Sequence, residues 1–249
     1  RVLLAIMVGC SLASAGAAFQ GIFQNPLVSP DFHGASQGAA FGACLAILCG
    51  ASSLAISVTA FAFSMLSVAV VLLVSKFSRG NRILVTVLAG VMVSSLFNAG
   101  VSFIKLVADP TSQLQAITFW LMGSLTSASQ RDVLLIAGPI VIGNIGLLAL
   151  RWRLNALTMG DDEAISMGVD APRVRSTVIV LATLIVASCV SVSGIIGWVG
   201  LVVPHLARGL VGADYRRLLP ASMLLGGTFL LVVDDIARMA TTAEIPIGI

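Results

Sequence analysis

Few residues of this chain have the types and spacing that catalysis would require. The run from Gly34 to Gly38 matches G-x-S-x-G, in which Ser36 would be a nucleophile on a strand-to-helix turn beside a histidine and an acid. Here the pattern opens an apolar stretch, and His205 is the sole remote histidine that could assist it. The sequence contains no G-x-x-x-x-G-K-[ST] phosphate loop, no H-E-x-x-H and no Cys/His metal cluster. We therefore expect no catalytic residue, no cofactor and no metal site, with an intramembrane serine hydrolase as a remote alternative.

A compact charged segment, residues 151–175, is the stronger candidate for a functional site. It lies between apolar stretches and holds 8 of the chain's 25 charged residues. Gly160 and Gly168 predict two short helices within it, with Asn155 as a cap and the acidic run 161–163 at a helix start. The alternative is an ordinary solvated loop, but such connections between packed helices are usually shorter. We expect the segment to dock a soluble partner.

The elements that must position this segment are transmembrane helices. Hydrophobic residues make up 58% of the chain and charged residues 10%, whereas a soluble domain carries about 25% charged residues. In lipid every backbone polar group is paired internally, so apolar spans are helices. Eight stretches are long and apolar enough: about 2–18, 35–50, 54–74, 84–107, 133–150, 176–192, 195–210 and 218–234. The sequence thus predicts an all-α, polytopic transmembrane helical bundle with a single membrane domain, residues 1–249.

The distribution of basic residues orients this bundle. Because successive spans alternate in direction, the loops fall into two sets, one with ten Lys and Arg and the other with four. Basic residues favour cytoplasmic loops, and the richer set contains residues 151–175. That segment is therefore expected in the cytoplasm, with its flanking arginines, Arg175 among them, at the membrane edge. Arg1 and Arg238 are expected outside, and the net charge of +3 is too small to indicate nucleic-acid binding.

Glycine and proline positions suggest an internal repeat. Two sets share the spacing of ten and eight residues: Gly16, Pro26 and Gly34, and Gly194, Pro204 and Gly212. The spans that precede them run in opposite directions, so the copies would form inverted repeats, as in many transporters.

The span 84–107 carries a polar ridge that could line a transport pathway. Its small and polar residues recur at every fourth position: Thr86, Gly90, Ser94, Asn98 and Ser102. Such a ridge can serve helix packing, or it can form the wall of a wet pathway. Both interpretations remain open from the sequence.

The last span ends in two acidic residues and an arginine. Asp234 and Arg238 are four residues apart, a spacing that allows a local ion pair on one helix face. Alternatively, Arg238 and Arg1 could contact an acidic patch on an external partner.

Several stretches together resemble the FecCD-type permeases, the membrane subunits of ABC importers for iron-siderophores, haem and vitamin B12. The matching stretches are GIFQNPLVSP at 21–30, WLMGSL at 120–125, LTMGDDEAISMGV at 157–169, GIIGWVGLVVPHLAR at 194–208, and DIAR at 235–238 followed by EIPIG at 244–248. They occur in the family's order over nearly the whole chain.

The resemblance implies a subunit of ten transmembrane helices that pairs with a second copy and with two cytoplasmic ATPases. On that pattern the chain lacks the first helix and most of the tenth. Residues 154–172 would form a cytoplasmic coupling loop whose short helices sit in a cleft of the ATPase. The residues that match its coupling positions are Leu157, Gly160, Asp161, Glu163, Ala164, Gly168 and Val169.

Other positions take roles from the same resemblance. The start of the fourth span, at Ile83 and Leu84, would be the cytoplasmic gate, and the ridge residues Gly90, Ser94, Asn98 and Ser102 would contribute to the pathway wall. Arg1 and Arg238 would meet glutamates on an extracytoplasmic substrate-binding protein. The remaining matches are to the family's structural motifs: Asn25, Pro26, Gly197, Pro204 and His205.

We therefore expect the permease subunit of an ATP-driven importer for an iron-chelate, with hydrolysis on a separate ATPase subunit. It would lie in the inner (plasma) membrane as a multi-pass protein in contact with the lipid bilayer. The alternative is an ion-coupled secondary transporter, which predicts an acidic residue deep in a span. None is evident, because Asp234 and Asp235 lie at a span end.

Overall fold

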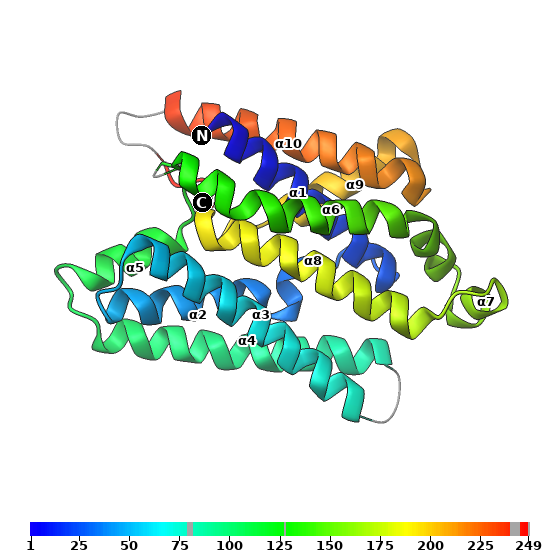
Figure 1. Ribbon diagram of the computed structural model, residues 1–249, viewed down its shortest axis with the longest axis horizontal. Helices are drawn as coiled ribbons and strands as arrows, with labels where there is room; N and C mark the ends of the chain where they lie inside the picture. The colour runs from blue at the N-terminus through cyan, green and yellow to red at the C-terminus, as the bar shows by residue number, and fades with distance from the viewer. Residues whose placement is uncertain (79–81, 127, 240–244, 249) are drawn as a thin grey trace. The chain divides into compact units, whose positions relative to one another are not determined.

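The computed structural model describes residues 1–78, 82–126, 128–239 and 245–248. Within these residues the secondary structure is entirely helical. The helices are α1 (Val2–Ile22), α2 (Ala35–Leu48), α3 (Ser53–Phe77), α4 (Arg82–Val107), α5 (Gln113–Leu121), α6 (Gln130–Thr158), α7 (Asp161–Ser166), α8 (Ala171–Ser193), α9 (Val199–Val211) and α10 (Tyr215–Met239), with a 3₁₀ turn at Pro30–His33 (Figure 1). The prediction of an all-α bundle is confirmed.

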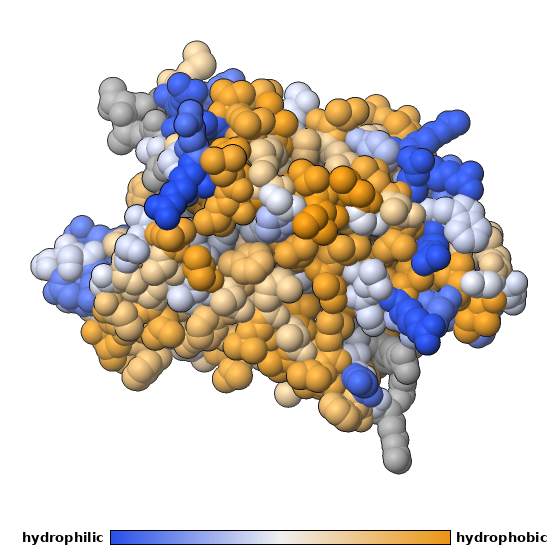
Figure 2. Space-filling view, in the orientation of Figure 1, coloured by the Kyte–Doolittle hydropathy of each residue, from blue (hydrophilic) through white to orange (hydrophobic). Residues whose placement is uncertain are grey.

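Six of these helices are long and apolar enough to cross a membrane: α1, α3, α4, α6, α8 and α10. The other two predicted spans correspond to the shorter apolar helices α2 and α9, of 14 and 13 residues. Hydrophobic side chains cover the middle of the visible face, whereas hydrophilic ones gather toward helix ends (Figure 2). This pattern is typical of helices that face lipid along their length.

The chain divides into two compact units. Unit 1 comprises 1–30, 130–186 and 198–235, and unit 2 comprises 31–129, 187–197 and 236–249. Helix α1 forms the core of unit 1 and is buried along most of its length. Helices α6 and α9 pack against it.

Two glycine contacts bring backbones of unit 1 together. A Cβ atom on Gly16 would lie 1.8 Å from the carbonyl oxygen of Gly200 in α9, and one on Gly9 would lie 2.2 Å from the oxygen of Gly226 in α10. Small residues at such points let transmembrane helices approach closely enough for extensive van der Waals contact. Helix α1 is therefore fixed directly to both α9 and α10.

A buried hydrogen-bond cluster joins α1 to α6. Ser14 donates to the side-chain oxygen of Asn144 at 2.5 Å, and the amide of Asn144 donates to Ser11 Oγ at 3.2 Å and to the carbonyl of Ile140 at 3.0 Å. All three side chains are less than a tenth exposed. Polar residues at membrane depth usually face a neighbouring helix, and here they fix the register of α1 against α6.

The seventh predicted span, 195–210, is wrong at its start. Residues 194–198 are not helical, and α9 begins only at Val199. At about 1.5 Å per residue, its 13 residues reach about 20 Å, less than the roughly 30 Å of a bilayer core. Gly200, at the start of α9, lies against Leu12 and Pro30, so α9 begins about halfway along α1.

Unit 2 is built around α2. This helix packs against α3, α4 and α5, with Gly38 and Gly42 against backbone carbonyls of α3. Phe41 of α2 meets Phe63 of α3 and Phe97 of α4, with ring centroids 5.3 and 5.5 Å apart. Aromatic pairs at these separations add to the apolar packing of the unit.

The local structure does not match at the positions that suggested an inverted repeat. Gly16 lies inside α1, whereas Gly194 lies outside the helices with φ +68. Pro26 lies in a turn, whereas Pro204 lies inside α9. Only the third pair agrees in backbone conformation, since Gly34 and Gly212 both have positive φ, although Gly34 precedes α2 and Gly212 follows α9. The inverted repeat therefore stays a prediction.

Candidate functional site

The charged segment contains one separate helix instead of the two predicted. Helix α6 continues to Thr158, because residues 151–159 include no glycine or proline and because Leu154 and Leu157 are buried. Gly160, with φ +123, starts the short helix α7, and Gly168, with φ +77, follows its end. Positive φ favours glycine at both positions. The segment thus presents α7 beyond the end of α6 (Figure 1).

The predicted coupling residues differ in exposure, with Gly160 and Asp161 partly exposed. Leu157, Ala164 and Val169 are buried, at 0%, 0% and 4% exposed, and they hold α7 against unit 1. Glu163 and Gly168 are exposed.

Three apolar side chains that the sequence analysis overlooked are exposed around α7: Met159, Ile165 and Met167, at 66%, 59% and 47%. Together with Glu163 they form the outward face of α7. Apolar side chains displayed next to acidic ones are typical of a surface that another protein covers.

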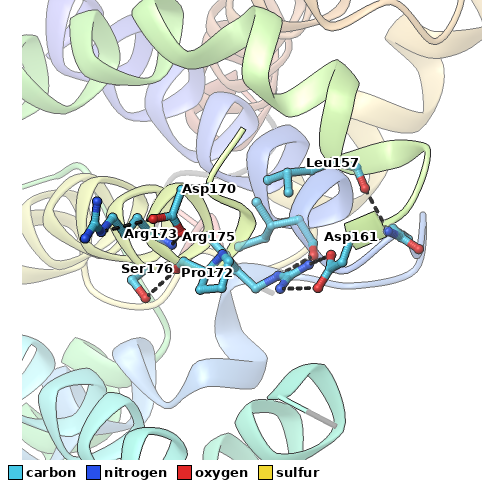
Figure 3. Close-up of polar contacts among 9 residues, drawn as sticks. Leu157, Asp161, Asp170, Pro172, Arg173, Arg175 and Ser176 are labelled. Carbon is cyan, nitrogen blue, oxygen red and sulfur yellow. Dashed lines mark hydrogen bonds and ion pairs between the residues drawn. The ribbon is translucent and has the colours of Figure 1, made fainter. Parts of the chain in front are cut away.

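A buried arginine ties α7 to two transmembrane helices. Arg175 of α8 donates through both terminal nitrogens to the carboxylate of Asp161, at 2.7 and 3.2 Å, and through Nε to the carbonyl of Ile22 at 3.1 Å (Figure 3). The Arg175 side chain is only 5% exposed. The prediction that Arg175 is a membrane-edge anchor is therefore wrong in its detail, because its guanidinium faces inward. This bidentate pair links the start of α7 to α8 and to the end of α1.

The turn after α1 makes a second connection. Gln24, at φ +50, donates to the carbonyl of Leu157 at 2.7 Å. Asn25 accepts the backbone N–H of Leu27 at 2.9 Å, which forms an Asx turn ahead of the exposed Pro26. The Asn25-Pro26 motif thus shapes a turn that lets Gln24 reach the end of α6.

Asn155 caps a different helix from the one predicted. It lies inside α6, where its side-chain oxygen accepts the backbone N–H of Tyr215 at 2.7 Å and its amide donates to Asp214 at 2.5 Å. These contacts provide a hydrogen-bond acceptor for a backbone N–H group in the first turn of α10 that has no partner within the helix. The backbone N–H of Arg216 and then the Asn155 amide lower the pKa of Asp214. The carboxyl end of α6 and the amino end of α10 are thereby joined.

The other motif residues lie on or before α9. Gly197 is non-helical, Pro204 is buried inside α9, and His205 is exposed. Trp198 has φ +68 and is 73% exposed at the start of this helix. A residue other than glycine rarely has a positive φ, and backbone strain of this kind is concentrated at functional sites. Sequence reasoning overlooked the unusual backbone at Trp198. The glycines on its amino side, Gly194 and Gly197, were the only indication in the sequence of a break before the helix.

The polar ridge of α4 changes in exposure along its length. Thr86 and Gly90 are buried, Ser94 is partly exposed, and Asn98 and Ser102 are exposed. Thr86 and Ser75 share a hydrogen bond of 2.7 Å, which serves helix packing. The first part of the ridge therefore packs inside unit 2 and its last part is exposed, and the pathway role stays a prediction.

The predicted gate lies beside that ridge. Ile83 is partly buried and Leu84 is 57% exposed, both in the first turn of α4. Their gating role stays a prediction.

Asp234 is fully buried and is bound by Arg1. Arg1 donates from Nε to both carboxylate oxygens at 3.0 Å and from its terminal nitrogen to Oδ1 at 2.7 Å. The sequence analysis paired Asp234 with Arg238, and this bond between the two ends of unit 1 was not anticipated. Arg238 is exposed on α10.

The hydrolase alternative is wrong. Ser36 lies in the first turn of α2, where its hydroxyl donates to Asp31, and the described part of the chain contains no strand from which a nucleophile turn could start.

A bundle of apolar helices that presents a short charged helix beyond its span ends defines a multi-pass membrane permease. The profile of the FecCD transport family matches residues 1–249, and the chain belongs to this family. It is 42% identical over 249 residues to the molybdate import permease MolB of Haemophilus influenzae. The alignment covers all of this chain and 74% of MolB. It is 41% identical to a probable iron chelatin permease of Helicobacter pylori (strain 26695), again over all of this chain and 75% of that protein.

A solved structure agrees with this assignment. A metal-chelate type ABC transporter in an inward-facing conformation superposes with a TM-score of 0.95 at 42% identity, over all of this chain and 79% of that chain. The hemin permease HmuU of Yersinia pestis is 39% identical over 260 residues, which cover all of this chain and 76% of that protein. The chain is therefore the permease component of an ABC importer and a multi-pass inner-membrane protein, so the secondary-transporter alternative is wrong.

Proposed function

We propose that this permease imports an iron-chelate and that ATP hydrolysis on separate ATPase subunits drives it through α7. The observation that carries the coupling proposal is the combination of a rigid attachment with an outward face. Asp161 is ion-paired to Arg175, whereas Glu163, Ile165 and Met167 point away from the bundle. A helix held in this way can receive a displacement from a partner and pass it to α1 and α8.

The family resemblance also implies three further partners: a binding protein, a second permease copy and the lipid bilayer. An extracytoplasmic binding protein would dock at the end of unit 1 that carries Arg1 and, on α10, at the exposed Arg238. A second copy of the permease would complete the pathway, with Asn98 and Ser102 on its wall and Ile83 and Leu84 at its gate. The exposed hydrophobic faces of the long helices that the second copy does not cover would contact the lipid bilayer.

Iron-chelate is the preferred substrate because relatives from Helicobacter pylori and Yersinia pestis bear the names of iron chelatin and hemin permeases. Molybdate is the second candidate, since the permease MolB is 42% identical. Both are small metal-containing species, so the fold alone is compatible with either.

Uptake into proteoliposomes distinguishes the two substrates. The permease is reconstituted with its ATPase and binding protein, and ATP-dependent entry of radiolabelled iron-siderophore is compared with that of labelled molybdate. We expect iron-chelate uptake that unlabelled molybdate does not inhibit. Uptake of molybdate alone would overturn the substrate assignment.

The coupling role needs a separate measurement. Glu163→Arg places a basic side chain on the outward face of α7, and Arg216→Glu reverses a charge on a different cytoplasmic segment as a control. We expect Glu163→Arg to abolish co-purification of the ATPase while the control retains it. Normal co-purification of both variants would contradict docking on α7.

A further inference from the structure

A pocket opens between the cytoplasmic ends of α6 and α8, beside the loop that follows α7. Its volume is about 300 Å³. Helix α6 contributes Leu150 and Arg153, and α8 contributes Arg173, Val174 and Thr177. The loop that leads from α7 into α8, residues 168–170, closes one side.

The pocket carries a net positive charge. Arg153 is exposed and has no ion-pair partner among the described residues. Arg173 pairs with Asp170 at 3.1 Å, and Asp170 also accepts the backbone N–H of Arg173 (Figure 3). The pocket lining thus has two guanidinium groups and one carboxylate, which already orients one of the guanidinium groups. A guanidinium binds phosphate oxygens through two parallel N–H donors. The Thr177 hydroxyl also lines the pocket, but it donates to the carbonyl of Arg173 at 2.9 Å.

Exposed apolar side chains continue from this pocket along the same two helices. Helices α6 and α8 touch where Gly146 meets Leu181 and where Gly143 meets Ile185. The exposed side chains Ile142 and Ile145 of α6, at 62% and 61%, lie on one side, and Val180 of α8, at 43%, lies on the other.

The neighbouring Trp152 is 42% exposed at the end of the span. Tryptophan at this level is typical of the membrane–water interface. The exposed apolar side chains therefore face the bilayer, and the pocket lies at the level of the lipid headgroups.

We propose that the pocket binds the phosphate headgroup of an anionic phospholipid of the cytoplasmic leaflet. The headgroup lies between Arg153 and Arg173, and an acyl chain lies along the exposed side chains of Ile142, Ile145 and Val180. Basic pockets between transmembrane helices on the cytoplasmic side suit such lipids. The exposed apolar side chains next to the pocket favour a lipid over a free phosphate, because a soluble anion makes no contact with them. The bound lipid contacts residues 168–170 and so braces the end of α7.

Native mass spectrometry of the purified permease measures this binding directly. The protein is titrated in detergent with phosphatidylglycerol and, in parallel, with phosphatidylcholine. We expect preferential retention of phosphatidylglycerol, weakened about fivefold by Arg153→Gln or Arg173→Gln and about 25-fold by both together. Arg151→Gln, a charge on the same helix outside the pocket lining, is the matched control and should leave retention unchanged. Melting temperatures of all variants show that they are folded.

Two further ligands separate the possible sources of the phosphate group. Glycerophosphoglycerol has the same headgroup without acyl chains, and inorganic phosphate has neither. We expect both to compete at least tenfold less well than phosphatidylglycerol. Equal competition by inorganic phosphate, equal retention of phosphatidylcholine, or variants that match the Arg151→Gln control would each overturn the proposal. The assay contains no ATPase and no transported substrate, so its outcome is independent of the transport proposal.

Discussion

The ion pair between Asp161 and Arg175 gives the sharpest test of how α7 is held. Asp161→Ala removes two hydrogen bonds, of 2.7 and 3.2 Å, and leaves a guanidinium that is 5% exposed with its bond to the carbonyl of Ile22. Hydrogen bonds to charged groups contribute about 1.5–3 kcal/mol each. Because the Asp161 side chain is 43% exposed, solvent screens the pair, and we take about 2 kcal/mol for the whole interaction.

That free energy acts on the docking of α7 and has little effect on the rest of unit 1. A loss of about 2 kcal/mol raises the undocked population of α7 about 30-fold. Hydrogen–deuterium exchange of the α7 amides reports this population. The N–H of Ala164, bonded to Gly160, and that of Met167, bonded to Glu163, are the two reporters.

Asp162→Ala is the matched control. Asp162 lies in the same first turn and is exposed, so its removal costs only the helix-end charge, about 0.3–1 kcal/mol. We expect about 30-fold faster α7 exchange in Asp161→Ala and less than about fivefold in the control. Equal acceleration in both variants would refute the claim that the Arg175 pair holds α7. In the assembled importer, Asp161→Ala should also retain the ATPase while reducing ATP-driven uptake, because a loosely held α7 transmits less displacement.

Three other perturbations test the remaining contacts. Gly16→Ala places a Cβ 1.8 Å from a backbone oxygen and should abolish a monodisperse permease in detergent, whereas Gly138→Ala, with no atom nearby, should behave as wild type. Asp234→Asn removes the charge that binds Arg1 and should lower the melting temperature and weaken binding-protein affinity; an unchanged melting temperature would contradict a structural role for the pair. A cysteine replacing Asn98 should react with a polar thiol reagent in at least one nucleotide state, and complete protection in every state would instead support helix packing.

Apolarity alone predicted the helical class and located the six helices that are long enough to cross a membrane, because long apolar runs have few other structures available in lipid. It did not predict the start of α9. Residues 195–198 are as apolar as the helix that follows, so the stretch appeared to be one span. The break depends on backbone conformation at Gly194 and Trp198, which hydropathy does not report.

The candidate site was predictable in outline but not in its contacts. Family resemblance located α7, and the hydropathy pattern placed Arg175 next to the start of a span. The inward direction of its guanidinium depends on Ile22, which is 153 positions away in the chain. Asn155 likewise has an ordinary sequence context, and its capping role appears only beside Tyr215. A single sequence does not specify such distant neighbours.

The glycine contacts of α1 have a consequence for measuring conformational change. Because Gly9 and Gly16 leave no space against α10 and α9, these helices have neither room to approach nor side chains that could readjust. Spectroscopic labels on α1 and α10 should therefore keep a constant separation through the ATP cycle. That separation provides an internal ruler against which the displacement of a label on α7 is measured.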